Sequence, residues 1–275
     1  MSNQDLVSIT KTYYDSQDAD EFYHTVWGGE DIHIGLYNSE TEKISDASNR
    51  TVVEMLSRLG EVSPGTRIID IGAGYGGAAR YIAKNTSAHV TCLNLSEKEN
   101  RRNIEKNEAQ GCAEQIDVIT GNFEALPFEE NSFDVAWSQD AILHSDNKEQ
   151  VFREVYRVLK PGGKLIFTDP MQANEVPDGV LDPILERIHL KEMGSVRKYK
   201  GIAEKLGFQV IEADEKPHQL QNHYTRVREE LELQKNKLLE NCSEEYINRM
   251  KKGLTHWVEG ARQGYLNWGI LIFQK

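Results

Sequence analysis

Short apolar runs alternate with amphipathic stretches through the middle of the chain, from about residue 61. Five of the runs have strand length and predict β-strands: RIIDI (67–71), HVTCLNL (89–95), IDVITGN (116–122), FDVAWSQ (133–139) and KLIFTDP (164–170). Helical spacing predicts helices over 78–85, 96–111 and 151–163, with Ser96 capping the second and Pro161-Gly162-Gly163 ending the third. Strands alternating with helices indicate βαβ units, and therefore a parallel sheet with ligands at the carboxyl ends of its strands.

The regular alternation of apolar runs and amphipathic stretches ends on either side of this region. After Pro170 the pattern predicts a helix over 196–206, a strand over 207–214 and a closing strand over 265–275. Charged helical sequence lies between the last two, and the leucines of VREELELQKNKLLE (227–240) indicate a solvated, half-packed helix. A further helix is predicted at about 47–59. We therefore predict two parts: an N-terminal helical lid over 1–60, and an α/β domain over 61–275 with a helical insertion at about 216–263.

The composition is that of an ordinary globular protein, with 39% apolar and 28% charged residues. The formal net charge of −12 repels nucleic acid and anionic lipid, so small molecules are the expected partners, with no nucleic acid and no membrane. The scattered Cys92, Cys112 and Cys242 form no C-x-x-C pair and no H-E-x-x-H occurs, so no metal site is predicted. The N-terminus shows no signal-peptide pattern, and we expect a soluble, cytoplasmic protein with reduced thiols.

The stretch IIDIGAGYGG (68–77) follows the first predicted strand into a glycine-rich turn. Its spacing Gly72-x-Gly74-x-x-Gly77 fits the dinucleotide fingerprint. Two neighbours argue against a dinucleotide. Asp70 would place a negative charge beside a pyrophosphate, whereas it suits a cation such as the ammonium of a methionine moiety. The second strand ends in Asn94, where dinucleotide sites use Asp or Glu to accept from ribose hydroxyls.

Two further motifs follow in order, GNFEALPF (121–128) and LKPGG (159–163). Together with IDIGAGYGG they resemble the class I S-adenosylmethionine-dependent methyltransferases. The resemblance implies S-adenosylmethionine as cofactor, with S-adenosylhomocysteine as product. It also implies an α/β fold with a Rossmann-like seven-stranded sheet whose last strand is antiparallel, which suits YLNWGILIFQK (265–275).

The same resemblance implies the cofactor-binding residues. Gly72 and Gly74 let the backbone approach the cofactor, and Asp70 lies near its methionine end. The remaining positions follow the other strands: Asn94 and Leu95 at the ribose, Asn122 and Phe123 at the adenine, and Gln139 at the end of the fourth strand.

Aromatic rings gather among acidic residues and histidines in the N-terminal part: Tyr13, Tyr14, Phe22, Tyr23, Trp27 and Tyr37. Such rings either pack a lid on the sheet edge or form a wall around a methylated ammonium, which each ring face stabilises by about 0.5–2 kcal/mol. A narrower resemblance follows from FYHTVWGGEDIHIGLY (22–37), AWSQDAILHS (136–145), FTDPMQ (167–172) and HQLQNHYTRVREELE (218–232). Over essentially the whole chain these resemble the N-methyltransferases that make glycine betaine, most closely the sarcosine/dimethylglycine branch.

This branch implies direct SN2 transfer of a methyl group to the amine of sarcosine or dimethylglycine, as part of osmolyte synthesis. Tyr23 and Trp27 are expected to face the methyl groups of the substrate. His144 is the candidate base for the amine proton. The alternative is that His144 is a structural hydrogen-bonding residue and that water takes the proton before the site closes.

The substrate carboxylate needs a cation. Arg226, helped by Tyr224, is the first candidate, because a guanidinium binds a carboxylate through two hydrogen bonds. Arg187 is the competitor. Alternatively, Arg226 forms a helix-surface ion pair with Glu229 or Glu230.

Other functions fit parts of the sequence. The glycine spacing also suits a nicotinamide-dependent oxidoreductase, against which Asp70, Asn94 and LKPGG argue. A non-catalytic S-adenosylmethionine-binding protein would share the fold. Methyltransferases of phosphoethanolamine, a sterol or another natural product need a phosphate pocket or an apolar tunnel, whereas the polar residues of 13–37 and 216–230 favour a small charged substrate.

Overall fold

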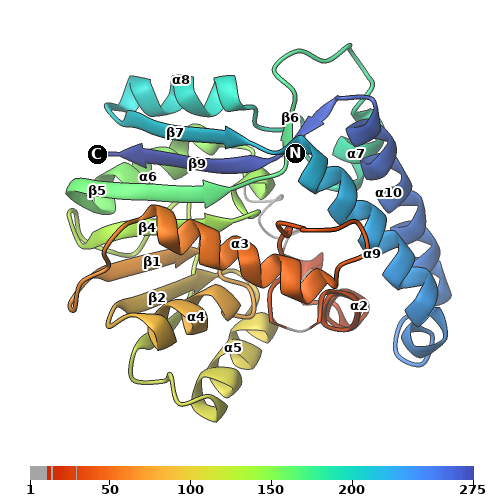
Figure 1. The fold of residues 1–275 in the computed structure, drawn as a ribbon, viewed down its shortest axis with the longest axis horizontal. Coiled ribbons are helices and arrows are strands. Elements are labelled where there is room, and N and C mark those ends of the chain that lie inside the picture. Colours follow the sequence, from red (N-terminus) through yellow and green to blue (C-terminus); the bar gives the residue numbers. More distant parts are fainter. Residues whose placement is uncertain (1–10, 14, 29) are drawn as a thin grey trace.

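The computed structural model describes residues 11–13, 15–28 and 30–275. Its centre is a seven-stranded sheet with the order β3-β2-β1-β4-β5-β9-β7 (Figure 1). The strands are β1 (Arg67–Ile71), β2 (His89–Asn94), β3 (Ile116–Thr120), β4 (Phe133–Gln139), β5 (Leu159–Thr168), β7 (Gln209–Glu215) and β9 (Gly269–Gln274). Strand β9 runs antiparallel to both of its neighbours, β5 and β7. The predicted Rossmann-like sheet with an antiparallel last strand is confirmed.

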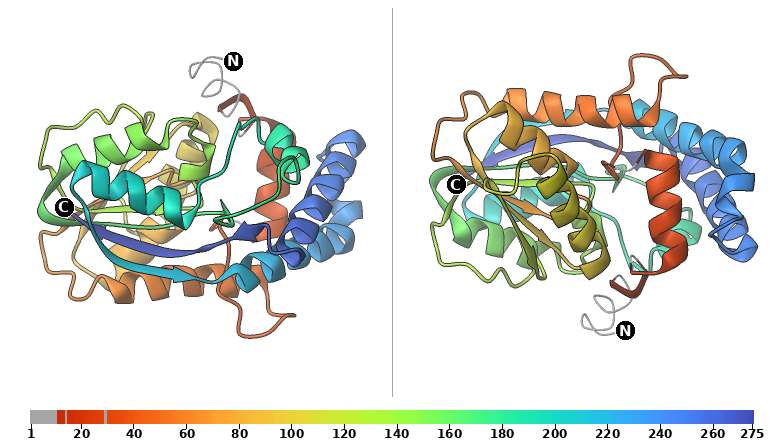
Figure 2. Two further views of the ribbon diagram at one scale, coloured as in Figure 1. Left: turned by 90° about the horizontal axis from the view of Figure 1, so that it is seen from above. Right: turned by 90° about the horizontal axis from the view of Figure 1, so that it is seen from below.

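Helices cover both faces of this sheet (Figure 2). Helices α3 (Ile44–Arg58) and α4 (Gly77–Asn85) pack on one face, and α6 (Lys148–Val158) and α8 (Val196–Leu206) pack on the other. Helix α5 (Glu97–Ala109) packs along β2 and β3 and begins at the predicted cap, where Ser96 Oγ accepts a hydrogen bond from Glu99 N at 3.1 Å. The three-layer arrangement leaves the carboxyl ends of the parallel strands open for a site.

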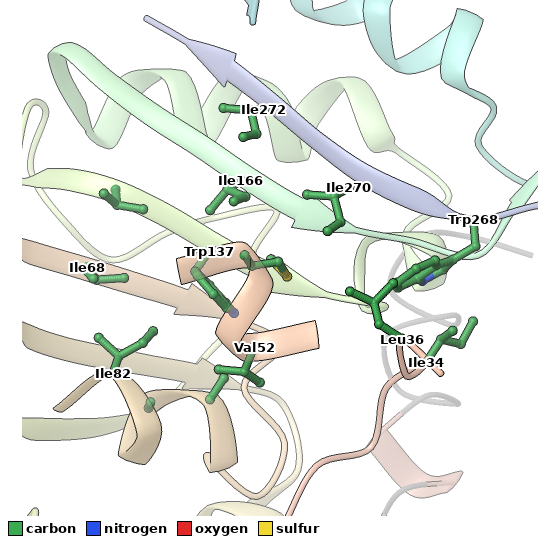
Figure 3. Close-up of a cluster of buried hydrophobic side chains, with 14 of the residues drawn as sticks. Ile34, Leu36, Val52, Ile68, Ile82, Trp137, Ile166, Trp268, Ile270 and Ile272 are labelled. Atoms are coloured by element: carbon green, nitrogen blue, oxygen red, sulfur yellow. The ribbon is translucent and has the colours of Figure 1, made fainter. Parts of the chain in front are cut away.

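Alternation along each strand divides the core into two clusters. Ile68 and Ile166 point to the α3 and α4 face, whereas their neighbours Ile69 and Leu165 lie in the cluster beneath α6 and α8. Figure 3 shows the first cluster, in which Trp137 of β4 lies among isoleucines of the sheet and beneath α3. Because both faces are covered, the central strands are mostly apolar on both sides, as their sequences predict, with polar residues concentrated near the strand ends.

One helix boundary differs from the prediction. Helix α6 ends at Val158 rather than at Gly163, and Leu159 already has an extended ψ of 138° as the first residue of β5. The residue before a proline disfavours helical geometry, so Lys160 cannot continue the helix into Pro161. The Pro-Gly-Gly segment therefore lies inside β5, where Phe133 pairs with Leu159 and Val135 with Lys164, a shift of register.

The remaining elements gather beyond the carboxyl ends of the strands (Figure 1). They are α2 (Gln17–Trp27), η1 (Ile142–His144), α7 (Asp182–Arg187), α9 (Pro217–Leu238), α10 (Glu244–Arg262), and the short paired strands β6 (Met171–Gln172) and β8 (Leu266–Asn267). Helix α2 packs on α9 and α10 through a cluster that includes Phe22, Val227, Leu231 and Leu254. Leu233 of α9 is 75% exposed, as a half-packed helix requires.

The N-terminal extension divides into two parts in space. Helix α3 contributes Val52 and Met55 to the core of the sheet, whereas α2 joins the helices over the strand ends. The division into a lid over 1–60 and a domain over 61–275 stays a prediction, and its first ten residues lie outside the described part. Among the described residues, no helix is both long and apolar enough to cross a membrane.

Candidate active site

A cleft opens at the carboxyl ends of β1, β2 and β4, and we name it the strand-end cleft. Its lining brings together most of the predicted cofactor residues: Gly72, Gly74, Asn94, Leu95, Asn122, Phe123 and Gln139. The sequence also predicts His144 in the active site, and this residue lies at one end of the cleft. Asp70 lies in a small adjoining cavity beneath the glycine turn, which Gly72 and Gly74 also line. Segments up to about 130 residues apart in the chain thus meet at one edge of the sheet.

The glycine turn needs glycine for two different reasons. Gly72 and Gly74 have φ angles of 84° and 52°, in the left-handed region that other L-residues disfavour. A Cβ atom at Gly72 would lie 2.3 Å from Cβ of Ala141, so the turn also needs space. The third glycine of the motif, Gly77, serves packing, because its Cβ would lie 2.2 Å from Oδ1 of Asp31 in the N-terminal extension.

Asp70 is a buried carboxyl group at the bottom of this turn. It is 3% exposed, and burial raises its pKa to about 7, with a lowering contribution from His33 and a raising one from Asp31. None of the hydrogen bonds found among the described residues reaches its carboxylate. A buried carboxylate without a protein donor fits a cationic ligand in the cavity beside it.

Asn94 has an acidic partner that the sequence analysis missed. Its Nδ2 donates to Oε2 of Glu99 at 2.8 Å, and Glu99 lines the strand-end cleft from the first turn of α5. Burial raises the pKa of Glu99 to about 7, against the hydrogen bond from Asn94, which lowers it. The signal was present in SEKE (96–99), where a capping serine is followed three residues later by Glu. The carboxylate that usually ends the second strand is thus supplied by the following helix.

Gln139 presents a donor without a protein partner. Its Oε1 accepts from Nε1 of Trp137 at 3.0 Å, which fixes the amide, whereas its Nε2 is buried and has no partner among the described residues. Phe123, 8% exposed, supplies an apolar wall. An unpaired donor, an unpaired carboxylate, a glycine cradle and an apolar wall fit S-adenosylmethionine, which carries a carboxylate, an ammonium and an adenine ring.

A second cavity adjoins the first, and we name it the aromatic pocket. It shares Ile32, Asp140 and His144 with the strand-end cleft. Four large rings line it in two pairs. Tyr23 and Trp27, four residues apart on one face of α2, have ring centroids 5.0 Å apart, and Tyr224 of α9 stacks on Trp257 of α10 at 4.7 Å. Two of the four rings, Tyr23 and Trp27, belong to the aromatic set that the sequence analysis names, and Tyr224 was expected there as a helper of Arg226. Tyr14 of that set lies outside the described residues.

Asp140 forms a rigid wall between the two cavities. It has a φ of 52°, and its carboxylate accepts from Ile34 N at 2.6 Å, Thr168 Oγ1 at 2.8 Å and Trp268 Nε1 at 2.8 Å. Burial raises its pKa, while these donors and His33 lower it. Three donors from three separate segments fix this residue, so it holds the N-terminal extension against β5 and β9.

Two aromatic side chains of the aromatic pocket, Trp27 and His223, each carry a ring N–H donor. Nε1 of Trp27 is buried without a hydrogen-bond partner among the described residues. Nδ1 of His223 faces the backbone N–H of Gly35 at 3.4 Å and the hydroxyl of Tyr37 at 2.8 Å. Since Nδ1 must accept from these groups, the neutral His223 ring carries its proton on Nε2. Burial and nearby His33 lower the pKa of His223 to about 3, so the ring is neutral at physiological pH.

The structure places the two candidate arginines differently. Arg226 lies outside the aromatic pocket, on an open groove, and pairs with Glu229, with Glu230 at 3.8 Å and with Glu42 O at 3.3 Å. The assignment of Arg226 to the substrate stays a prediction, but residues two apart on a helix do not share a face, and Tyr224 is the one that lines the pocket. The helix-surface ion pair is the observed alternative.

Arg187 is the arginine that lines the aromatic pocket. Its Nη2 lies 3.2 Å from the sulfur of Met250, and the hydroxyl-bearing rings of Tyr23 and Tyr224 are close enough to affect its pKa. No carboxylate lies within ion-pair distance of Arg187 among the residues that the structure describes. A partly buried guanidinium without a protein carboxylate is suited to an anionic group of a ligand.

His144 lies where the two cavities meet, as a candidate base should. Burial, assisted by the charges of Lys148 and Arg187, lowers the pKa of His144 to about 4. The ring is therefore neutral at physiological pH and can accept a hydrogen bond. A base with so low a pKa holds a proton poorly against an aliphatic amine, so the lowered pKa favours the structural alternative, although the position suits a base.

The chain is similar to known methyltransferases. A family model described as a methyltransferase domain matches residues 69–167, which contain the glycine turn and strands β2 to β4. The sarcosine/dimethylglycine N-methyltransferase of Aphanothece halophytica is 53% identical over 276 residues, covering 100% of both chains. That of Halorhodospira halochloris is 50% identical over 269 residues, covering 98% of this chain and 96% of the relative.

A solved structure shows the same fold at high similarity. The chain from Galdieria sulphuraria assigned as a sarcosine dimethylglycine methyltransferase superposes with a TM-score of 0.91 and 42% identity, covering 96% of this chain and 98% of that one. The likeness extends beyond the family model to α2, α9 and α10, which line the aromatic pocket.

Proposed function

The chain belongs to the sarcosine/dimethylglycine N-methyltransferases, and from that premise we propose how its residues hold the cofactor and the substrate. The activity is S-adenosylmethionine-dependent methylation of sarcosine, dimethylglycine or both, and methylation of dimethylglycine yields glycine betaine. When bound, the cofactor would supply the methyl group of its sulfonium for direct transfer to the amine nitrogen, with S-adenosylhomocysteine as the leaving group. A role of the product as an osmolyte belongs to the same proposal.

The strand-end cleft holds the cofactor. Asp70 receives the ammonium, because its carboxylate is buried without a protein donor. Nε2 of Gln139, the unpaired buried donor, binds the carboxylate end. Asn94 and Glu99 together bind the ribose hydroxyls, with the amide holding the carboxylate in place at 2.8 Å. Leu95, Asn122 and Phe123 enclose the adenine.

The aromatic pocket holds the amino acid. Arg187 binds the substrate carboxylate, and the Nε2–H of His223 and the Nε1–H of Trp27 are two further donors in the same pocket. Tyr23, Trp27 and Tyr224 enclose the methylated nitrogen, whose developing positive charge their ring faces stabilise. Most of the rate enhancement then comes from alignment of the nitrogen with the methyl group across the boundary at Asp140 and His144.

The amine must be neutral when it reacts. Among the described residues that line the aromatic pocket, the carboxylate is that of Asp140, and three donors already bind it. His144 and His223 have pKa values near 4 and 3, so their neutral rings are too weakly basic to keep the proton of an aliphatic amine. We assign both histidines to hydrogen bonding, and the substrate amine loses its proton to water before the pocket closes.

The observation that carries the substrate assignment is the unpaired Arg187 in a pocket of four aromatic rings. The test is a methyl-transfer assay with glycine, sarcosine, dimethylglycine and phosphoethanolamine, with products identified by mass. Betaine from dimethylglycine is the expected result, and methylation of phosphoethanolamine alone would overturn it. Changing Arg187 to Met should raise the KM for dimethylglycine by about 100-fold, since a charge-assisted pair contributes about 1.5–3 kcal/mol.

A further inference from the structure

Helix α10 carries a glycine in its interior that its backbone does not require. Gly253 lies in the middle of Glu244–Arg262 and is absent from the glycines that have a positive φ. Glycine inside a helix costs about 0.5–1 kcal/mol of stability relative to alanine. A glycine at this place therefore needs another explanation than backbone conformation.

The explanation lies in the side chain that packs on it. A Cβ atom built on Gly253 would lie 2.5 Å from Nε of Arg187, 2.6 Å from its Cδ and 2.7 Å from its Cζ. Such separations are below van der Waals contact, so a methyl group would force the guanidinium away. The arginine occupies the space that a side chain at position 253 would fill.

The guanidinium of Arg187 also contacts a second residue on the face of α10 that carries Gly253. Met250 precedes Gly253 by three residues and therefore lies on the same face, and its sulfur is 3.2 Å from Nη2 of Arg187. Arg187 itself is the last residue of the short helix α7, which packs on α10. Gly253 and Met250 thus form a seat for the guanidinium at the wall of the aromatic pocket.

We infer that Gly253 is a positioning residue that fixes Arg187 for recognition of the substrate carboxylate. The inference rests on the proposed function, because it assigns to Gly253 an effect that acts through Arg187. It predicts that a small gain in helix propensity at this position is accompanied by a loss of substrate binding. A role of Gly253 in stability alone predicts the reverse pattern.

The test is Gly253→Ala, with Gly201→Ala as its matched control. Gly201 lies inside helix α8, and a Cβ there would meet nothing within 4 Å. We expect Gly253→Ala to raise the KM for dimethylglycine by about tenfold or more, because a 1 Å misplacement of a positioning group can cost up to about 100-fold. The melting temperature and the Kd for S-adenosylhomocysteine should stay within the range that Gly201→Ala shows.

A double-mutant cycle separates the possible outcomes. If Gly253 acts through Arg187, then adding Gly253→Ala to Arg187→Met leaves the KM of the single Arg187 variant unchanged. Equal fold-changes in both backgrounds would overturn the inference, as would a Gly253→Ala enzyme that matches the Gly201→Ala control.

Failure of the proposed function gives a different result. In that case, wild type transfers no methyl group to sarcosine or dimethylglycine, or Arg187→Met retains the KM of wild type. Where Arg187→Met fails to bind substrate but Gly253→Ala matches its control, the proposed function stands and the inference about Gly253 is wrong.

Discussion

The hydroxyl of Tyr37 lies 2.8 Å from Nδ1 of His223 and donates to it, joining the N-terminal extension to helix α9 across 186 residues of sequence. This contact fixes the proton of His223 on Nε2, since Nδ1 is occupied as an acceptor. Burial raises the pKa of Tyr37 far above its usual value, so its hydroxyl remains a donor at all working pH values. The N-terminal extension, through Tyr37, thus fixes the tautomer of His223 on helix α9, and His223 lines the aromatic pocket.

Changing Tyr37 to Phe removes this donor without removing the ring. We expect the KM for dimethylglycine to rise by about 3- to 10-fold, because one neutral hydrogen bond contributes about 0.5–1.5 kcal/mol. The Kd for S-adenosylhomocysteine should not change. Tyr156→Phe, on α6 beneath the opposite face of the sheet, is the control, and equal kinetics in the two variants would separate Tyr37 from the substrate site.

Changing Trp27 to Ala removes a face of the aromatic wall. The expected result is a 3- to 30-fold loss of kcat/KM for dimethylglycine, corresponding to about 0.5–2 kcal/mol of cation–π stabilisation. Trp27→Phe keeps a ring but loses the unpaired Nε1–H, so wild type against Trp27→Phe measures the donor, and Trp27→Phe against Trp27→Ala measures the ring. Unchanged steady-state kinetics in Trp27→Ala would remove this residue from the site.

Changing Arg226 to Met should have little effect on catalysis. Its guanidinium pairs with Glu229 and Glu230 on an open groove, and exposed pairs of this kind contribute about 0–1 kcal/mol to stability. We expect the KM for dimethylglycine to stay within about twofold of wild type, in contrast to Arg187→Met. A large, selective loss for carboxylate-bearing substrates would restore Arg226 as the anchor.

Changing Glu99 to Gln tests the carboxylate that helix α5 supplies. Hydrogen bonds to charged groups contribute about 1.5–3 kcal/mol, so we expect the Kd for S-adenosylhomocysteine to rise about 10- to 100-fold at pH 8. The KM for dimethylglycine at saturating cofactor should change little. Glu97→Gln is the matched control, because Glu97 pairs with Lys11 at the surface. Isothermal titration calorimetry that finds equal affinities would show that Glu99 does not contact the cofactor.

Asp70 predicts a pH dependence in the cofactor-free protein. Its pKa rises from 3.8 to about 7 on burial, so its contribution to stability is present below pH 3.8 and is lost as the pH rises through about 7. We therefore expect Asp70→Asn to unfold at a higher temperature than wild type at pH 8, with the difference disappearing near pH 4. Thermal unfolding at several pH values measures it, and a constant difference would contradict the shift.

The same residue predicts proton release on cofactor binding. An ammonium beside Asp70 favours its ionised form, so the affinity for S-adenosylhomocysteine should increase as the pH rises through about 7. Titrations in buffers of different ionisation enthalpy measure the released proton. Asp70→Asn should bind more weakly and lose this dependence, and an unaltered pH profile in that variant would assign the proton to another group.

Local patterns were sufficient for the central part of the fold. The strands of 67–71 and 133–139 and the helix of 196–206 have the boundaries that their sequences predict, because strand and helix periodicity are properties of consecutive residues. The glycine turn and Asp70 were also singled out from the sequence, whereas Gln139 was implied by the resemblance to methyltransferases; all three lie together because the carboxyl ends of parallel strands meet at one edge. The boundary at Leu159 was missed because a glycine-rich segment that begins a strand resembles one that ends a helix.

The sequence by itself thus determined the sheet, the glycine turn and the presence of aromatic rings that line the aromatic pocket. Only the tertiary structure decided which charged side chains line the strand-end cleft and the aromatic pocket. That Arg187 rather than Arg226 lines the aromatic pocket depends on the rotation of α9 about its axis and on the packing of α7 against α10, neither of which neighbouring residues encode. The partnership of Asn94 with Glu99 likewise depends on how α5 returns along β2. Periodicity selects the face that is buried, whereas the contacts within a cavity arise from segments that meet only after the chain has folded.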